Sequence, residues 1–545
     1  MTQTSNAPHP LPCVVQLGFA GSRRLFEKPP ADPKLRAELD LKVERHLMGC
    51  LAQLREKLDL HANHFLVGMS QIACGADMLF TRACLQAMPQ PIPQRIVLPQ
   101  HRAAYLSAAG SDGTLDFTKE EQAEAEALLK EQHIIQERVV SRSADRAAQF
   151  METSAEILRV SDVIVCLLRH DSSAKPGGTN ELLERAKKRG TPVLEICVGL
   201  QNGEPTFDER WHNLDAEHPF KRPHLPPELA HESVRISTEP LPTIAEFCEP
   251  LKKLVSTQAQ GHQRLFRWAA GAIIVTHTLA TICATVAVVY HKPGEHHEPF
   301  SLYHPGLIPP LLAVEVLLLL AGFWVHQHLH HSHAARLWAA ARVVAELARS
   351  VRAIGPHHVY LAHLFRLPLP HRFRFLLRTL NVLHLRSTWP NRMADWKGTR
   401  DTYIHDRVDH QIAFYEKSLA KDERRSQWCQ FFFTVYSLLA MAATAEKLAV
   451  SIWSPANEAW LAELGLLAIV LPVVAVGGLS WSAALDCEAR VETFGETLRF
   501  LKRQRPLLEQ AASVGEFDGL LLETETTLLG ETANWFSRRS NTGVT

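Results

Sequence analysis

The stretch Trp268–Tyr290, WAAGAIIVTHTLATICATVAVVY, contains no formally charged residue. A helix needs about 20 predominantly apolar residues to cross the hydrocarbon core of a bilayer, so this stretch predicts a membrane-spanning helix. Three more stretches approach or exceed that length, namely Leu307–Val325, Phe431–Trp453 and Leu464–Trp481. The alternative is a set of buried core helices, but segments this long and apolar are hard to bury in a soluble fold. The sequence therefore predicts four membrane spans.

Basic residues flank these spans unevenly. The connections His291–Pro305 and Leu448–Glu463 together hold one Lys or Arg, which is Lys292. The other helix ends carry the basic residues Arg264, Arg267, Arg336, Arg342, Arg349, Lys417, Lys421, Arg424, Arg425 and Arg490. Because cytoplasmic loops are enriched in Lys and Arg, we expect both chain ends and the long middle stretch to lie in the cytoplasm.

The order of features repeats along the chain. A basic approach helix, a membrane hairpin with a short outer loop and a charged amphipathic exit helix occur over Gln260–Arg352 and again over Tyr403–Arg505. This repetition predicts an internal duplication.

Ionisable side chains occur near membrane depth. They are costly there and usually face a partner helix or a water path, so Glu315 is our candidate pore-lining residue. Glu446 and Lys447 fit an outer-interface position equally well. The histidines between His326 and His333 have no carboxylate or cysteine close by to complete a metal site, so we interpret them as a membrane-interface band and predict no metal.

Composition excludes several other classes. The 545 residues carry a formal net charge of zero, so nothing indicates a nucleic-acid partner. The ten cysteines are scattered singly without a CxxC pair, which indicates neither a zinc site nor a disulfide framework but reduced thiols. The segment Met1–Pro12 lacks the basic and apolar regions of a signal peptide.

The N-terminal part alternates strand and helix patterns. The predicted strands are Val14–Ala20, Phe65–Gly68, Arg95–Leu98, Val163–Leu168 and Thr191–Val198, and helices are predicted between them, such as Leu35–Leu58 and Leu182–Arg189. Strands that alternate with helices imply an α/β fold with a Rossmann-like, doubly wound parallel sheet.

Three strand-to-helix turns of this sheet contain glycine, at Gly18–Gly21, Gly75 and Gly177–Gly178. In such sheets ligands bind beyond the carboxyl ends of the strands, and glycine lets backbone N–H groups approach a phosphate closely. The turns therefore predict a phosphate or nucleotide pocket. Alternative roles remain open, because Asp77 fits a helix cap and Arg23 a solvated surface position. Glu181 and Glu184 fit a helix-dipole role.

The ordered set Gly18-Phe19-Ala20-Gly21-Ser22-Arg23, Gly75-Ala76-Asp77, Leu98-Pro99, Ser161-Asp162-Val163-Ile164-Val165, Gly177-Gly178-Thr179 and Gly190-Thr191-Pro192-Val193 resembles the SLOG superfamily over about residues 12–200. This Rossmann-like fold is shared by the LOG nucleotide hydrolases and by ligand-sensing domains of bacterial defence systems. The resemblance implies a nucleotide-type ligand, phosphate held by backbone amides and Arg23, and ribose met by acidic residues. The expected ligand-binding residues are Gly18, Gly21, Ser22, Arg23, Gly75, Asp77, Gly177, Gly178, Thr179 and Glu181.

The same resemblance bears on catalysis. LOG-type phosphoribohydrolases carry a Pro-Gly-Gly-x-Gly-Thr-x-x-Glu signature, and this chain has Pro176-Gly177-Gly178-Thr179-Asn180-Glu181-Leu182-Leu183-Glu184. Glu184 stands at the carboxylate position, and Glu181 is a second candidate. Asn180 and Glu181 replace the second glycine–threonine pair, however, so the sequence resembles the sensing branch more than the hydrolase branch.

Amphipathic helices are predicted beside the membrane hairpins, over Tyr403–Lys417, Ala335–Glu346 and Cys487–Glu492. This arrangement resembles SLATT domains, two-helix membrane effectors that are found fused or adjacent to SLOG and nucleotide-signalling genes. The resemblance is best over about residues 400–505 and less specific over 261–354. Known SLATT units have two spans, so four spans suggest a tandem arrangement.

The predicted organisation has six parts: an α/β domain over 1–200, a linker and approach helix over 201–260, a first hairpin over 261–354, a cytoplasmic basic segment over 355–402, a second hairpin over 403–510 and a tail over 511–545. The Pro-rich residues 201–240 are expected to be irregular. We expect a homo-oligomer in a bacterial inner membrane, in contact with the lipid bilayer and with no cofactor besides its ligand. The resemblances imply that a nucleotide-derived signal gates or assembles a pore in anti-phage defence. A membrane-tethered nucleotide hydrolase and a constitutive channel or transporter remain alternatives.

Overall fold

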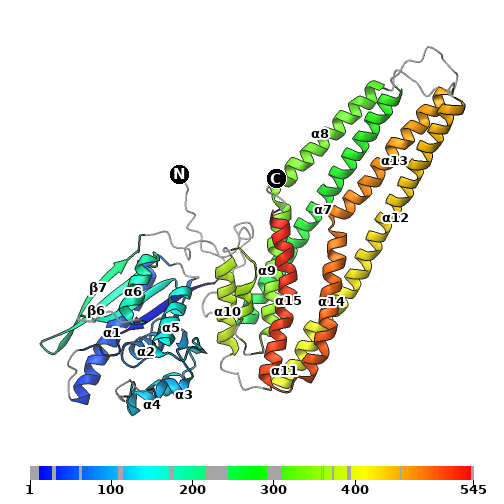
Figure 1. Cartoon of the computed structure of the whole chain (residues 1–545). Helices are drawn as coiled ribbons and strands as arrows, with labels where there is room; N and C mark the ends of the chain where they lie inside the picture. The colour runs from blue at the N-terminus through cyan, green and yellow to red at the C-terminus, as the bar shows by residue number, and fades with distance from the viewer. Residues whose placement is uncertain are drawn as a thin grey trace. The chain divides into compact units, whose positions relative to one another are not determined.

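The computed structural model describes residues 12–26, 32–60, 64–108, 115–170, 177–215, 243–290, 308–357, 359, 361–370, 373–388, 395–454 and 457–541 (Figure 1). The chain forms two compact units. The first comprises residues 1–251, 354–366 and 370–395, and the second comprises 252–353, 367–369 and 396–545.

The first unit is built on a seven-stranded sheet in the order β4-β3-β2-β1-β5-β6-β7. Its strands are β1 (Cys13–Gly21), β2 (His64–Ser70), β3 (Gln94–Leu98), β4 (Ile134–Val139), β5 (Val163–Arg169), β6 (Val193–Gln201) and β7 (Glu204–His212). All neighbours pair in parallel except β6 and β7, which are antiparallel. The predicted α/β class with its largely parallel sheet is confirmed.

Two strands were not predicted. Strand β4 extends the sheet beyond β3, and β7 forms the opposite edge. Residues 204–212, which were expected to belong to an irregular linker, form β7 instead, with Phe207 and Trp211 packed against the core on one face. Edge strands tolerate the proline and charges that hide this pattern in the sequence.

Helices cover both faces of the sheet. On one face, α1 (Pro33–Lys57) and α2 (Ala76–Leu85) pack on Val15, Leu17 and Phe19 of β1. On the other face, α5 (Arg146–Val160) and α6 (Thr179–Lys188) pack on the even-numbered side chains of β5. The short helices α3 (Arg102–Leu106) and α4 (Lys119–Leu128) complete a third cluster beside β3.

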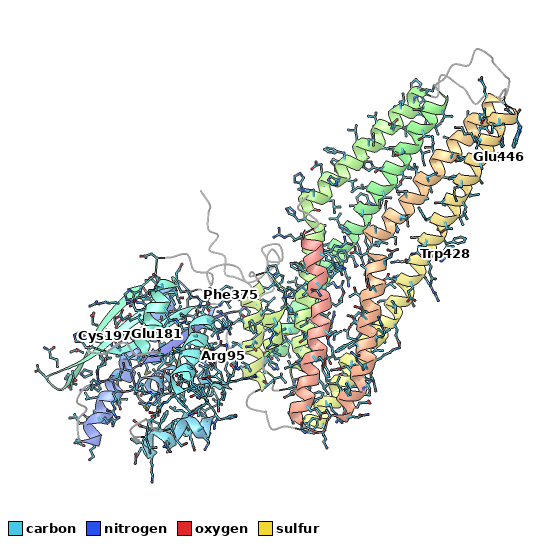
Figure 2. The ribbon with its side chains drawn as sticks, viewed as in Figure 1. Arg95, Glu181, Cys197, Phe375, Trp428 and Glu446 are labelled. Atoms are coloured by element: carbon cyan, nitrogen blue, oxygen red, sulfur yellow. The ribbon has the colours of Figure 1, made fainter. Side chains whose placement is uncertain are left out.

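A helix from the middle of the chain belongs to this α/β unit. Helix α10 (Arg374–Thr388) follows the short 3-10 helix η3 (Ala362–Arg366) and packs Val382 and Leu385 against side chains of β1, β2 and β4, which are Val14, Val67 and Ile135. Phe375, labelled in Figure 2, is buried in the core of the first face. The predicted cytoplasmic basic segment over 355–402 thus contains a helix of the α/β fold.

One buried ion pair fixes α10 on the sheet. Arg378 of α10 pairs with Asp162 at the start of β5, and their side chains are 4% and 8% exposed. Arg378 Nη2 also donates to the Val160 carbonyl oxygen at 3.1 Å, while Asp162 Oδ2 accepts from the Gln16 N–H at 2.9 Å. A charged pair this deep is retained only when both partners are hydrogen-bonded, so α10 is an integral element of the unit.

The second unit is helical. Its elements are α7 (Ile244–Tyr290, from Lys252 on), α8 (Ile308–Ser332), α9 (Ala334–Ile354), α11 (Trp396–Tyr403), a π-helical turn η6 (Ile404–Asp409), α12 (His410–Trp453), α13 (Glu458–Ala484), α14 (Cys487–Gln510) and α15 (Val514–Asn541). Four helices are long and apolar enough to cross a membrane, and they contain the four predicted stretches except residue 307, which lies outside the described residues. The prediction of an all-helical region with four candidate membrane helices is therefore confirmed. In Figure 2, Glu446 lies near the end of α12 that precedes the loop to α13.

Small residues bring the apolar helices close together. A Cβ atom on Gly271 of α7 would lie 2.3 Å from the ring of Trp481 of α13, and one on Gly322 of α8 would lie 2.8 Å from Thr276 Oγ1. Glycine at such contacts lets helix backbones approach in the way that membrane helices associate.

Candidate functional site

Two arginines converge on one carboxylate at the carboxyl edge of the sheet. Arg23 follows β1, Arg146 opens α5 after β4, and both pair with Asp116, with Arg23 Nη1 3.0 Å from Asp116 Oδ1. The guanidinium groups also lie over the ring of Phe150, 4.8 Å and 5.9 Å from its centroid. Two cations held by one anion leave positive charge at this edge, and the Arg23 side chain is 36% exposed. Such a group is suited to meet an anionic ligand.

Two buried polar groups lie beside Arg23. Asp77 in the first turn of α2 is 4% exposed and Tyr105 of α3 is 1% exposed, and neither Asp77 Oδ1 nor the Tyr105 hydroxyl has a hydrogen-bond partner among the described residues. Burial raises the pKa of Asp77 to about 8, although Arg23 and hydrogen bonds with the backbone of Ala73 and Gln71 act in the opposite direction. Burial, followed by the charge of Asp77, raises the pKa of Tyr105. Unsatisfied buried groups are uncommon and often mark functional sites.

A third polar group lies at the switch point of the sheet. The chain leaves β1 toward β2 on one side and returns through β5 on the other, and ligands of such sheets bind where the strand order reverses. Here Ser22 N donates to the Leu167 carbonyl oxygen at 2.9 Å, and Arg169 N donates to Ser22 Oγ at 3.2 Å. Arg169 Nε is buried without a hydrogen-bond partner among the described residues, so a third guanidinium joins this edge.

The glycines of the first two turns bring Arg23 and Asp77 together. A Cβ on Gly21 would lie 2.2 Å from Ala76 Cβ, and a Cβ on Gly75, whose φ is +81°, would lie 2.2 Å from the Arg23 carbonyl oxygen. The turn after β1 therefore packs directly on the start of α2. Gly18 has a comparable role, because its Cβ would meet Ser161 Oγ at 2.4 Å. Within the described residues these glycines allow close packing of the chain on itself.

The third turn is held by its own glutamate. Glu181 Oε2 accepts from Gly177 N at 2.7 Å, and Ser154 Oγ donates to the Gly177 carbonyl oxygen at 3.1 Å. Gly178 is the N-cap of α6, and Thr179 is its first residue. Glu184 is 60% exposed and pairs with Lys187 on the same helix. Residues 171–176, including Pro176 of the predicted signature, lie outside the described residues.

Sequence reasoning identified Ser22, Arg23 and Asp77 at this edge but missed Tyr105, Asp116, Arg146, Phe150 and Arg169. Arg169 could have been found, because it directly follows the predicted strand Val163–Leu168. The other four lie in helices and a connection after β3 and β4, where no local motif marks them. We refer to Arg23, Asp77, Tyr105, Asp116, Arg146 and Phe150 as the carboxyl-edge cluster.

A cavity of about 490 Å³ lies at the opposite edge, beside the starts of β2, β3 and β4. Its lining is mostly apolar, with Arg55, His64, Gln90, His133 and Arg386 as polar groups. Arg55 Nη1 donates to the His64 carbonyl oxygen at 3.0 Å, so one of these groups already supports the strand start. Unpartnered charged and polar groups converge at the carboxyl edge instead, and we place the candidate site there.

Asp77 gives the site a pH signature. Its pKa is about 8 in the folded unit against an ordinary 3.8, so folding takes up a proton between these values. Stability supplied by the neutral carboxyl is then lost as pH rises from about 4 to about 8, by up to ~1.4 kcal/mol per pH unit. In thermal unfolding, the stability of Asp77→Asn relative to the wild type should therefore increase with pH across this range. Above about pH 8 the difference in stability should stay constant. Parallel pH profiles of the two proteins would contradict the assignment.

The helical unit contains a second buried polar network. Arg407, in the π-helical turn, donates from Nε and Nη2 to both oxygens of Glu525 at 2.8 and 2.9 Å, and from Nη2 to Glu346 Oε1 at 3.0 Å. Tyr403 adds a hydrogen bond to Glu525 at 3.0 Å. The network joins α9, the start of the second hairpin region and α15. Single π turns inside helices frequently occur at functional sites.

Polar side chains also lie among the apolar helices. A groove of about 450 Å³ between α7 and α13 is lined by His277, Thr278, Thr281 and Ser480, together with apolar residues around Pro472. A Cβ on Gly477 of α13 would lie 3.1 Å from Thr278 Oγ1, so the helices are close at this point. Glu315 of α8 does not line the groove and makes no ion pair within the described residues, and its role as a pore residue stays a prediction.

Comparison with protein families gives one match. Residues 403–535 match the model of the SMODS and SLOG-associating 2TM effector domain 1, SLATT_1. The match supports the SLATT-like assignment of the second hairpin and extends through α14 into α15. Comparisons with curated proteins and with solved structures found no match. The SLATT match and the four apolar helices together indicate a membrane effector.

Proposed function

We propose that this protein is a ligand-gated membrane effector of bacterial anti-phage defence. In this proposal a nucleotide-derived signal binds the carboxyl-edge cluster in the cytoplasm, and the helical unit responds by forming or opening a pore in the inner membrane. The observation that carries the proposal is the coexistence in one chain of a SLATT-type membrane region and an arginine-rich switch point in an α/β sheet.

The chemistry of the cluster supports a nucleotide. Arg23 and Arg146 share one carboxylate, so a phosphate could take over part of their hydrogen bonding. Phe150 offers an aromatic face in the same place. The unpartnered oxygens of Asp77 and Tyr105 are suited to sugar hydroxyls or base edges.

The path of the chain supports coupling. The α/β unit contains the first residues of α7 and passes into the helical unit within this helix, after residue 251. It receives the chain from α9 at residue 354 and leads into α11 after residue 395. Both membrane hairpins are therefore attached to elements of the ligand-binding unit, one of which is α10. A ligand must favour one state by about 5.5 kcal/mol to convert a mostly closed population into a mostly open one.

The membrane region supports a permeation path. Polar residues at membrane depth usually face a partner helix or water, and the groove between α7 and α13 gathers His277, Thr278, Thr281 and Ser480 among apolar helices. The groove is therefore our candidate for the route across these helices.

The geometry does not favour the hydrolase alternative. Glu184 pairs with Lys187 at 3.2 Å on an exposed helix face, and Glu181 accepts a hydrogen bond from Gly177 and pairs with Arg185. A catalytic carboxylate is expected to be free to face its substrate.

Ion flux from liposomes tests the proposal. The purified full chain should be impermeant alone and should release ions with at least one member of a panel of cyclic dinucleotides, cyclic trinucleotides and ADP-ribose derivatives. Glu184→Gln should respond like the wild type, and nucleoside monophosphates should stay intact. Equal flux without ligand would indicate a constitutive channel, and impermeant vesicles across the whole panel would contradict gating by these nucleotides.

A further inference from the structure

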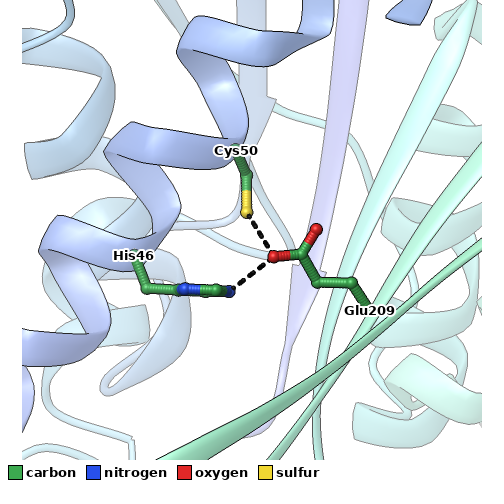
Figure 3. Close-up of side chains that lie close together, drawn as sticks. All are labelled: His46, Cys50 and Glu209. Carbon is green, nitrogen blue, oxygen red and sulfur yellow. Dashed lines mark hydrogen bonds and ion pairs between the residues drawn. The ribbon is translucent and has the colours of Figure 1, made fainter.

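A group of three potential metal ligands lies away from the carboxyl-edge cluster. His46 and Cys50 are four residues apart on α1, and Glu209 comes from the facing edge strand β7 (Figure 3). His46 Nε2 lies 3.0 Å from Glu209 Oε1, Cys50 Sγ lies 3.6 Å from the same oxygen, and the three ligand atoms are all within 4.8 Å of one another. Residues four apart on a helix project from one face, so both side chains reach β7.

Glu209 is a charged residue on an otherwise apolar face of strand β7. The neighbouring side chains on that face, Phe207 and Trp211, pack against the apolar core under α1. Glu209 has no ion pair with Lys or Arg among the described residues. Its side chain is 38% exposed, and the groups nearest its carboxylate are the imidazole of His46 and the thiol of Cys50.

The unsatisfied atom of the group is on His46. His46 Nε2 is buried and, despite its 3.0 Å separation from Glu209, is not aligned for a hydrogen bond. The ring is fixed by stacking on Phe207, with centroids 3.7 Å apart and planes at 7°. The imidazole nitrogen therefore points into the group without serving an aligned neighbour.

We propose that His46, Cys50 and Glu209 bind a zinc ion that links α1 to the β6–β7 hairpin. Bonds of about 2.0–2.3 Å to tetrahedral zinc place ligand atoms roughly 3.3–3.7 Å apart, and the two separations given above lie close to this range. Imidazole, thiolate and carboxylate are all zinc ligands. Water supplies the fourth position, because the Glu209 side chain is 38% exposed.

Zinc binding displaces the thiol proton of Cys50. The Sγ–Zn bond forms as the Cys50 thiol loses its proton to solvent, so one proton is released for each zinc ion bound. The sequence did not indicate this site, because Glu209 lies far along the chain and joins the helix only through an unpredicted strand.

Cobalt(II) is a suitable probe, since its absorption reports tetrahedral geometry and thiolate coordination. The tag-free full chain in detergent, stripped with a chelator, should give a tetrahedral cobalt spectrum with a sulfur-to-metal band, and zinc should displace it. Cys50→Ser should lose the sulfur band, and His46→Asn should weaken binding by at least about a hundredfold, because loss of even a supporting partner costs 10–100-fold.

Cys197→Ser is the matched control. Its thiol also lies beside a glutamate, 3.8 Å from Glu195, but on the other face of the same hairpin, where Lys187 and His212 already pair with that carboxylate. This variant should keep the full cobalt spectrum. The proposal would be overturned if the wild type and Cys50→Ser gave identical spectra, or if a folded wild type gave no tetrahedral spectrum. The group would then be an imidazole–carboxylate contact without a metal.

Discussion

Replacing Arg407 with alanine is expected to destabilise the helical unit by about 3–5 kcal/mol, the cost of leaving a buried charge without its partner. The Arg407 and Glu525 side chains are 4% and 0% exposed. Arg407 also bonds Glu346 of α9, which is partly buried, so the variant removes a cation that two carboxylates share. Thermal unfolding in detergent should shift strongly, and hydrogen exchange of α15 should increase.

Arg505→Ala is the matched control. Arg505 also makes a two-point ion pair, to Asp409 at the end of the same π-helical turn, but both side chains are more than one-third exposed. Exposed pairs contribute at most about 1 kcal/mol, so this variant should unfold nearly like the wild type. Arg407→Met combined with Glu525→Leu should recover part of the loss, since removing both charges avoids an unpaired one. Equal effects of Arg407→Ala and Arg505→Ala would contradict the network.

Arg378→Ala should loosen α10 from the sheet at a comparable cost of about 3–5 kcal/mol to the α/β unit. Among the described residues, the change leaves the buried Asp162 side chain with the Gln16 N–H as its one hydrogen-bond donor, and it removes the hydrogen bond to Val160. Hydrogen exchange should rise in α10 and at the start of β1, where Thr379 accepts from Val14 N and donates to the Pro12 carbonyl oxygen.

Arg159→Ala separates this effect from general loss of charge. Arg159 lies in the last turn of α5, three residues before Asp162, is 64% exposed and pairs with Glu156 on its own helix. Its removal should therefore have little effect on stability. If α10 exchanged as slowly in Arg378→Ala as in Arg159→Ala, the helix would not depend on this pair. A fragment ending near residue 260 lacks α10 and would expose Val14, Val67 and Ile135. Ligand binding is therefore best measured on the full chain.

The sequence predicted what local patterns determine. Apolar runs long enough to span a membrane predicted the four candidate membrane helices, and buried runs such as Val163–Leu168 predicted the central parallel strands. Both signals are contained within one element. Because ligands of such sheets bind beyond the carboxyl ends of the strands, the sequence also predicted that Ser22, Arg23 and Asp77 lie at the same edge.

Non-local features were not predictable in this way. Helix α10 has an amphipathic pattern, but nothing in it indicates that its apolar face covers strands β1, β2 and β4, which lie more than two hundred residues earlier. On one face of strand β7, Phe207 and Trp211 flank Glu209, and polar residues stand between them in the sequence. The proline and the charges of this stretch are nevertheless typical of a loop. Asp116 and Arg146 meet Arg23 only through the fold, so no spacing in the sequence marks the cluster.

The central claim is that the carboxyl-edge cluster binds a nucleotide-type anion, and equilibrium binding to the full chain tests it most directly. With the same nucleotide panel, we expect one ligand to bind the wild type and Arg24→Ala, which replaces an exposed neighbour, with equal affinity. Arg23→Ala should bind at least about tenfold more weakly, because a hydrogen bond to a charged group contributes about 1.5–3 kcal/mol. A nucleotide that binds Arg23→Ala as tightly as the wild type would contradict the account.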